Sequence, residues 1–164
     1  LLNIDKESIK NGIKSFELTK KRMDLLKVND ITIINDSYNA SYESMKASLE
    51  YLSNINANRK IAVLGDMFEL GDYSEELHRK VGEEIVKNNI DILISCGENA
   101  KYIVQQAEKV GMKKENIYYV KDIQEVEEKI LKLVKPKDVL LIKASNGMKF
   151  FNIVEYIKDS FNIK

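Results

Sequence analysis

The sequence predicts an α/β protein with a doubly wound, mainly parallel sheet of about five parallel strands plus one antiparallel edge strand. Five short apolar runs, rich in β-branched residues, lie at residues 31–34, 60–64, 92–95, 117–120 and 138–142. A helical pattern of apolar residues follows each run. Runs that are apolar throughout indicate strands buried on both faces, as in parallel sheets with helices on either side. Right-handed crossovers then make the sheet doubly wound.

The start of the chain is expected to lead into this sheet. Residues 1–21 are polar and weakly periodic, which indicates a short helix followed by a loop. Residues 23–28 and 31–34 flank the pair Asn29-Asp30, which favours a tight turn. The two segments therefore predict a hairpin whose first strand is the antiparallel edge strand.

The helices follow from the spacing of their apolar residues. The first runs from about residue 41 to 52, and the segment Asp72-Tyr73-Ser74-Glu75 has the capping-box spacing that would begin the second. Pro136 separates the fourth helix from the last strand. The apolar stripes are Met45, Leu49 and Leu52; Leu77, Val81 and Ile85; Ala100, Ile103, Val104 and Ala107; Ile123, Val126, Ile130 and Leu133; and Phe150, Ile153, Val154, Ile157 and Phe161.

Composition narrows the possible functions. The 164 residues fit a single domain, and 44% apolar with 32% charged residues is typical of a soluble globular protein. The 26 basic residues balance 26 acidic ones, which argues against a nucleic-acid binder. No apolar run reaches the roughly 18 residues of a membrane span.

One histidine and one cysteine offer no metal-ligand cluster. We expect Cys96 to be a buried, inert thiol, and a single cysteine fits the reducing cytoplasm.

Polar residues follow three of the predicted strands. Because ligands bind outside the carboxyl ends of strands in open α/β sheets, we expect these residues at the working edge of the molecule. They are Asp36 and Asn39 after the first run, residues 65–71 after the second, and Lys143 and Ser145 after the last. Neither G-x-G-x-x-G nor G-x-x-x-x-G-K-[ST] occurs in the chain. A doubly wound sheet suggests a nucleotide ligand, but the chain has no phosphate-binding loop of its own. Any ATP that it contacts would therefore be held mainly by groups outside this chain.

These segments carry a resemblance to the Mur ligase family. Asp36-Ser37-Tyr38-Asn39-Ala40-Ser41 is similar to the motif D-x-Y-N-A-N-P-x-S, and residues 65–71 and 143–149 match further motifs in the same order. The match is to the C-terminal domain, in the branch that joins D-alanyl-D-alanine to UDP-N-acetylmuramoyl-tripeptide. The resemblance implies that residues 1–22 are a hinge and tail from a preceding central domain and that residues 23–164 are the C-terminal domain. A chain beginning with Leu1 rather than Met fits such a fragment.

The resemblance also implies an activity. The whole enzyme would be an ATP- and Mg²⁺-dependent amide ligase of cytoplasmic peptidoglycan synthesis. The family's phosphate loop, magnesium carboxylates and carbamylated lysine belong to the central domain. We therefore expect no catalytic residue and no metal ligand in this chain, which would be inactive alone. Its partners would be the two substrates and its own N-terminal and central domains.

For the nucleotide, the resemblance implies contacts from Asp36, Asn39 and Arg22. The Asp36 carboxylate could accept hydrogen bonds from a ribose diol, or it could be a cap or turn residue of the following helix. Arg22 could instead be a solvated surface charge. Asn39 offers both a donor and an acceptor, and Tyr38 could stack on a ligand or pack locally.

For the substrate, the sequence points to Gly65, Asp66, Met67 and Glu69. Glycine permits tight backbone geometry, and the two carboxylates could bind the ammonium group of the dipeptide. The alternative is an ordinary turn with solvated acids.

Lys143 and Ser145 could bind an anionic group such as a carboxylate or phosphate. Ala144 and Asn146 stand where the family commonly has glycine and arginine. Without that arginine charge, anion binding by this loop has weaker support. We expect His78, the single histidine, to face solvent or cap a helix rather than to catalyse.

Other classes remain open. A folylpolyglutamate synthase is a related candidate, although its strand-end motif more typically ends in a histidine than in Tyr38-Asn39. A phospho-acceptor receiver domain also has five parallel strands, and Asp36 and Lys143 fit it superficially. Its third strand should end at an aspartate, yet the chain reads Ser95-Cys96-Gly97. A pure interaction module would need an exposed apolar stripe, which we do not identify.

Overall fold

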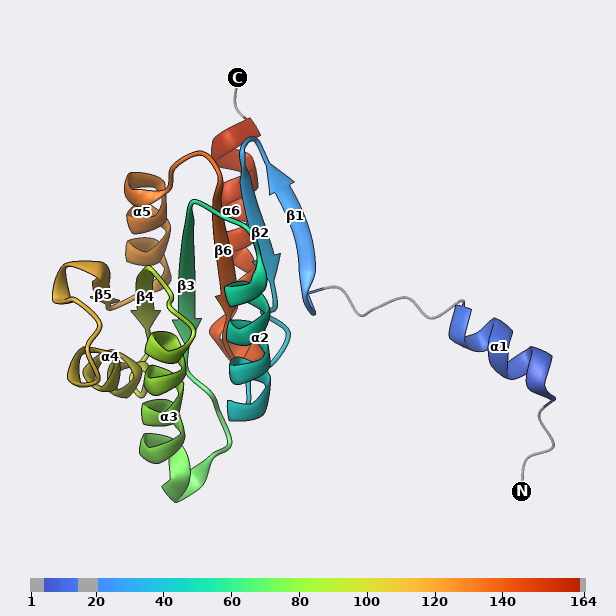
Figure 1. Ribbon diagram of the computed structural model, residues 1–164, viewed down its shortest axis with the longest axis horizontal. Helices are drawn as coiled ribbons and strands as arrows, with labels where there is room; N and C mark the ends of the chain where they lie inside the picture. The colour runs from blue at the N-terminus through green and yellow to red at the C-terminus, as the bar shows by residue number, and fades with distance from the viewer. Residues whose placement is uncertain (1–4, 15–20, 163–164) are drawn as a thin grey trace.

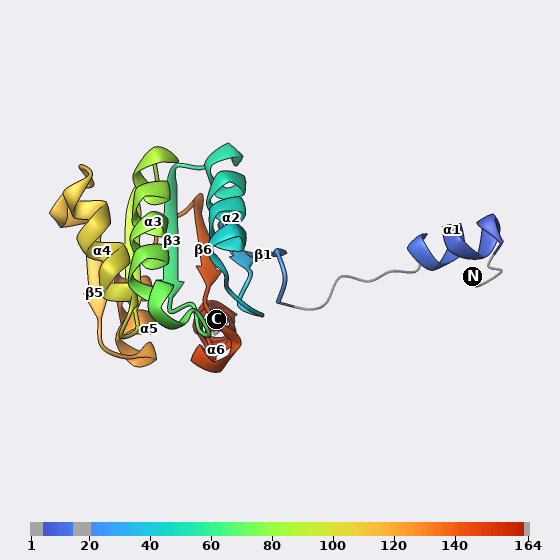
Figure 2. The same ribbon diagram turned by 90° about the horizontal axis from the view of Figure 1, so that it is seen from below.

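The computed structural model describes residues 5–14 and 21–162, and it contains a six-stranded sheet between two layers of helices (Figure 1). A short helix, α1 (Lys6–Lys14), comes first and stands apart from the sheet in both views (Figures 1 and 2). This agrees with the short helix expected there. The expected hinge over residues 1–22 lies partly outside the described residues.

The strand order is β1-β2-β6-β3-β4-β5. The strands are β1 (Asp24–Val28), β2 (Ile31–Asn35), β3 (Arg59–Gly65), β4 (Ile92–Cys96), β5 (Ile117–Val120) and β6 (Asp138–Lys143). β1 pairs with β2 antiparallel and all other pairs are parallel. The hairpin closes with Val28 opposite Ile31, and Asn29 in the turn has a φ of 52°, which asparagine tolerates. The predicted fold class and edge strand are both confirmed.

Helices cover both faces of the sheet, as Figure 2 shows. One face carries α2 (Tyr42–Asn54), α3 (Ser74–Lys87) and α4 (Ala100–Lys109), and the other carries α5 (Ile123–Leu133) and α6 (Phe151–Asn162). Successive strand residues alternate between two cores: Ile33 packs with the α5 and α6 side, and Ile34 packs with the α2 to α4 side. This is why the strand runs are apolar throughout.

The topology places a crevice at the end of β6. The chain passes from β2 through α2 to β3, leaving room for β6 between the two strands. The helices after β2 and β3 lie on one face, whereas α6, which follows β6, lies on the other. Such a reversal is the switch point where open α/β sheets bind ligands. In sequence order the parallel strands run first, fifth, second, third, fourth, and this differs from the receiver-type order 2-1-3-4-5. The receiver alternative is therefore wrong.

The capping box predicted at the start of α3 is also wrong. Residues Gly71–Tyr73 form a 3-10 turn that continues into α3, and no side chain caps that helix. Since Asp72 already lies within the turn, it cannot act as the flanking cap residue. A capping box does occur at α2, where Ser41 Oγ accepts from Ser44 N–H and Ser44 Oγ accepts from Ser41 N–H.

Candidate functional site

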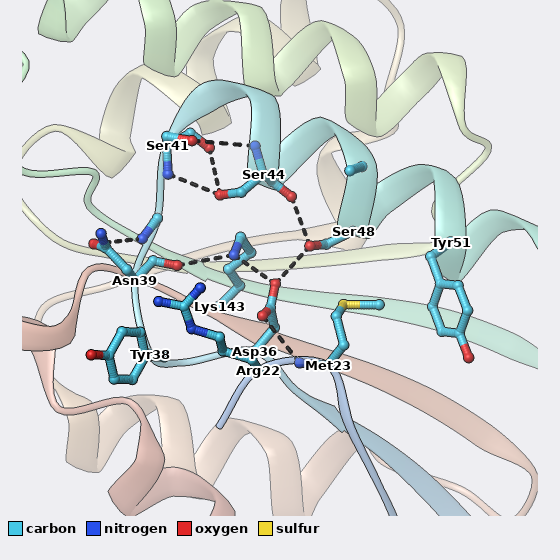
Figure 3. Close-up of a pocket in the computed structure, with 12 residues that line it drawn as sticks. Arg22, Met23, Asp36, Tyr38, Asn39, Ser41, Ser44, Ser48, Tyr51 and Lys143 are labelled. Atoms are coloured by element: carbon cyan, nitrogen blue, oxygen red, sulfur yellow. Dashed lines mark hydrogen bonds and ion pairs between the residues drawn. The ribbon is translucent and has the colours of Figure 1, made fainter. Parts of the chain in front are cut away.

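A cavity of about 580 Å³ lies at the carboxyl ends of β2 and β6, beside the start of α2. We call it the first cavity, and Figure 3 shows its lining. It brings together the three residues expected to contact a nucleotide: Arg22, Asp36 and Asn39. The remaining lining residues are Met23, Tyr38, Ala40, Ser41, Ser44, Ala47, Ser48, Tyr51 and Lys143.

An ion pair forms the inner wall of this cavity. Lys143 Nζ lies 2.6 Å from Asp36 Oδ2 and donates to the Asn39 carbonyl at 3.0 Å. Lys143 is only 1% exposed and Asp36 7% exposed. Burial lowers the pKa of Lys143 below its usual range, the charge of Asp36 opposes that shift, and the charge of Arg22 adds to it. The ammonium group thus bonds within the protein rather than standing free for an anion.

The Asp36 carboxylate makes two more contacts. Oδ2 accepts from Ser48 Oγ at 2.7 Å, and Oδ1 accepts from Met23 N–H at 3.2 Å. A carboxylate has about four acceptor positions, so roughly one remains for a ligand. The N-cap of α2 is Ser41, so Asp36 does not cap that helix. It was expected outside the core, yet it is buried.

Arg22 and Tyr38 form the outer wall. The Arg22 guanidinium lies 4.3 Å from the centre of the Tyr38 ring, and both side chains are exposed. Tyr38 N–H donates to the Lys21 carbonyl at 3.0 Å. Residues 21–23, which lead into β1, are therefore bonded to the end of β2 at two places: the Lys21 carbonyl to Tyr38 and the Met23 N–H to Asp36. The Tyr38 ring thus packs locally against Arg22, one of the two roles expected of it.

A second cavity, of about 450 Å³, shares Tyr38, Asn39, Ala40 and Ser41 with the first. Its other walls are the loop after β3 and the loop after β6. They contribute Phe68, Glu69, Leu70, Ser145, Asn146 and Gly147. Of the residues expected to contact substrate, Glu69 and Ser145 lie in this lining, and Glu69 is exposed.

Gly65, Asp66 and Met67 lie in the lining of neither cavity. A Cβ atom on Gly65 would come within 2.7 Å of Ala144 Cβ and of the Phe150 ring. Asp66 Oδ1 accepts from the N–H groups of Asn99 and Ala100 at 3.0 and 2.7 Å and so caps the start of α4. The Met67 side chain is buried. These three residues therefore bond and pack within the protein in this structure, and their expected substrate contacts stay a prediction.

Ser145 joins the two loops of the second cavity. Its Oγ accepts from Phe68 N–H at 2.8 Å, and its own N–H donates to the Asp66 carbonyl at 3.0 Å. Ser145 is 4% exposed. It is held firmly in place, with its hydroxyl hydrogen still able to be donated.

His78 is fully buried, so the expectation that it faces solvent is wrong. It lies three residues before Val81 and seven before Ile85, on the buried face of α3. That spacing was a signal in the sequence for its burial. Ser48, three residues after Met45 on α2, was missed in the same way. Cys96 is buried as expected, and burial raises the pKa of its thiol to about 11.

The described residues meet the requirements of neither a metal site nor a membrane-spanning helix. Among the described residues, no three His, Cys, Asp or Glu side chains come together in a way that could hold a metal ion. None of the helices within residues 5–14 and 21–162 is long and apolar enough to span a bilayer.

Comparison with known proteins identifies the family. A family model described as Mur ligase, glutamate ligase domain, matches residues 21–146. The UDP-N-acetylmuramoyl-tripeptide–D-alanyl-D-alanine ligase of Bacillus subtilis is 32% identical over 156 residues, which cover 94% of this chain and 34% of that protein. The chain thus spans about a third of the length of the relatives it matches.

Solved structures agree. A MurF ligase from Thermotoga maritima in complex with ADP superposes with a TM-score of 0.74 at 28% identity, covering 90% of this chain and 32% of that one. A folylpolyglutamate synthase from Mycobacterium tuberculosis reaches 0.62 at 8% identity over 94% of this chain and 36% of its own, which shows only a common fold. The chain therefore belongs to the Mur ligase family, and its sheet and helices form the C-terminal, glutamate ligase domain of that family.

Proposed function

We propose that this chain is the C-terminal domain of a ligase that joins D-alanyl-D-alanine to UDP-N-acetylmuramoyl-tripeptide at the expense of ATP. The reaction would belong to the cytoplasmic stage of peptidoglycan synthesis. Support comes from the relatives bearing this name, which match 94–95% of the chain at 32–35% identity. Residues 1–22 would be the tail and hinge of a preceding central domain, and residues 23–164 the C-terminal domain.

One observation carries the proposal: the buried Asp36–Lys143 pair at the switch point of the sheet. Lys143 and Ser48 hold the Asp36 carboxylate in one orientation, leaving it about one acceptor position for a ribose hydroxyl. The Asn39 side-chain oxygen accepts from Ala40 N–H, and no partner within the described ranges takes its NH₂ donors. Together with the exposed Arg22, these groups suit the nucleoside part of ATP.

The second cavity would receive the dipeptide. Glu69 contributes an exposed carboxylate that can attract the ammonium end of D-alanyl-D-alanine before it loses its proton and attacks. Ser145 could donate its hydroxyl hydrogen to the dipeptide. Because the two cavities share residues 38–41, nucleotide and acceptor would lie side by side. Lys143 lines the first cavity, whereas Gly65, Asp66 and Met67 line neither and would hold in place the loop that carries Glu69.

The triphosphate and Mg²⁺ would be held by the central domain. The chain contains no phosphate-loop motif, and the described residues contain no carboxylate cluster of the kind a metal ion needs. The carboxylate of the tripeptide would be activated as an acyl phosphate there, and the amine of the dipeptide would displace phosphate to form the amide bond. The contribution of this chain would be to bind and orient the nucleoside and the amine.

The test is a ligation assay with the full-length protein. Phosphate release should require ATP, Mg²⁺, the UDP-linked tripeptide and D-alanyl-D-alanine together, with the peptide product confirmed by mass spectrometry. L-Alanyl-L-alanine is the matched control and should give little product. Turnover with glutamate and a folate in place of these substrates would instead support the folylpolyglutamate alternative. The 164-residue chain alone should give no product in any mixture.

A further inference from the structure

The loop between β3 and α3 is fastened to the rest of the domain by side chains from two different elements. From the loop after β6, Ser145 Oγ accepts the N–H of Phe68 at 2.8 Å. From α3, His78 Nε2 accepts the N–H of Met67 at 3.0 Å. Phe68 and Glu69, which follow, are exposed and line the second cavity. Two consecutive backbone donors are thus satisfied by side chains from two different elements.

The hydrogen bonds of His78 define its tautomer. Because Nε2 accepts from a backbone N–H, it carries no hydrogen. The hydrogen of the neutral ring is then on Nδ1, which donates to the Ser74 carbonyl at 2.7 Å, one turn earlier in α3. The imidazole therefore connects the first turn of α3 to Met67, and both ring nitrogens are used.

The surroundings favour this neutral form. Burial lowers the pKa of His78, while the Ser74 carbonyl and the negative charge of Asp66 act in the opposite direction. A doubly protonated ring would place an N–H donor against the N–H of Met67. The ring nitrogens are bonded to the protein interior, so His78 does not itself reach a ligand.

The exposed part of the loop has an unusual backbone conformation at Glu69 and a close contact at Phe68. Glu69 has a φ of 63°, in the left-handed region, so its carboxylate direction is set by an unusual backbone conformation. The ring of Phe68 packs close to Gly147, where an added Cβ would come within 2.9 Å of it. A shift of the Met67 backbone would therefore be passed directly to both side chains.

We propose that His78 is a positioning residue: by accepting the Met67 N–H, it fixes the loop that presents Phe68 and Glu69 to the second cavity. Through this loop it sets the affinity for the amine substrate without touching it. That the second cavity receives an amine, and that this amine is D-alanyl-D-alanine, rests on the proposed function, whereas the positioning of the loop does not.

Two variants separate the bonds of His78. In His78→Gln the amide oxygen can reach the position of Nε2 and still accept from Met67. In His78→Asn the shorter amide can reach only the position of Nδ1, so the Ser74 bond can be kept while the Met67 donor loses its acceptor. A role limited to packing in α3 would affect both variants alike.

The first measurement is amide hydrogen exchange by NMR on the 164-residue chain. We expect the Met67 amide to exchange about tenfold faster in His78→Asn than in His78→Gln, since one hydrogen bond is lost. The Ala100 amide, which bonds to Asp66, is the internal control and should not differ between them. Equal protection of Met67 in both variants would overturn the proposal.

A measurement on the unmodified chain needs no variant to fold. The nitrogen chemical shifts of the imidazole should show Nδ1 carrying the hydrogen and Nε2 free at neutral pH. A ring with its hydrogen on Nε2 could not accept from Met67, and that result would also overturn the proposal.

Kinetics of the full-length protein then tests the consequence. His78→Asn should raise KM for D-alanyl-D-alanine about tenfold and leave KM for ATP unchanged, whereas His78→Gln should stay close to the unmodified protein. If Met67 loses protection in His78→Asn while the dipeptide KM does not change, positioning of the loop is supported and the dipeptide assignment of the second cavity is wrong. If neither changes, positioning itself is overturned.

Discussion

Lys143 Nζ and Asp36 Oδ2 lie 2.6 Å apart although the two residues are 107 positions apart in the sequence. Each residue comes at the end of a strand: β6 and β2 pair in parallel, with Ile142 opposite Asn35. The backbone continues this pairing one residue further, because Asp36 N–H donates to the Ile142 carbonyl at 3.0 Å. The ion pair thus joins the carboxyl ends of β2 and β6, where the loops that follow these two strands begin.

The first prediction concerns the stability of this pair. Lys143→Met leaves the Asp36 carboxylate buried without its cation, and breaking a buried pair in this way costs about 3–5 kcal/mol. The variant should therefore unfold at clearly lower denaturant. The double variant Asp36→Asn with Lys143→Met removes both charges and should recover a substantial part of the loss. Equal stability of Lys143→Met and the unmodified chain would mean that the pair is solvated rather than buried.

The second prediction concerns close packing at Gly65. An added Cβ would come within 2.7 Å of both Ala144 Cβ and the Phe150 ring. Gly65→Ala should consequently lower the free energy of unfolding by about 1–3 kcal/mol, the usual cost of overpacking. Gly12→Ala, where an added Cβ meets nothing within 4 Å, is the matched control and should not destabilise. Chemical denaturation of both variants provides the comparison.

The fold was predictable from the sequence because every strand and helix of the sheet region has a local signal. The strand runs 31–34 and 117–120 could be recognised because parallel strands buried on both faces are apolar throughout. The boundary at α3 was not predictable, since a 3-10 turn over Gly71–Tyr73 continues into the helix without a cap.

The site was predictable only in outline. The strand ends that form it follow from the order of the elements, and Asp36, Asn39 and Arg22 do meet at one cavity. The bonding of each side chain depends on distant partners. Asp66 is occupied by the start of α4, some 33 residues away, and no spacing in the sequence reveals this. The burial of His78 was visible in its helical spacing to Val81, but its bond to Met67 was not.

The third prediction is a pH dependence of stability that arises from His78. Because its pKa is lowered in the folded chain, the unfolded chain binds more protons as the pH falls below about 6.5, the ordinary histidine value. The free energy of unfolding contributed by the neutral ring is thus fully present above that pH. It declines as the pH falls toward the folded pKa, by at most about 1.4 kcal/mol per pH unit.

His78→Gln has no titrating ring and should lose this part of the slope. Urea denaturation at a series of pH values between 7.5 and 5 would compare the two chains, whose stabilities should diverge below about 6.5, the ordinary histidine pKa. Parallel curves for the variant and the unmodified chain would show that His78 titrates equally in the folded and unfolded states.

The last prediction tests the nucleotide assignment without disturbing the core. Arg22 lines the first cavity and is exposed, and its guanidinium lies over the ring of Tyr38, which is itself exposed. Arg22→Met should leave the free energy of unfolding unchanged to within about 0.5 kcal/mol, as is usual for surface substitutions.

If Arg22 contacts the nucleotide in the full-length protein, the same variant should lower kcat/KM for ATP about tenfold, which corresponds to about 1.4 kcal/mol of lost transition-state stabilisation. The matched control is Lys27→Met, which removes an exposed cation from the same end of the chain, in β1, but outside the first cavity. It should change neither quantity. Since both variants remove one positive charge from the surface, a general electrostatic effect on ATP would appear in both. A loss confined to Arg22→Met therefore locates the nucleotide at the first cavity, and equal kinetics for the two variants would remove Arg22 from the site.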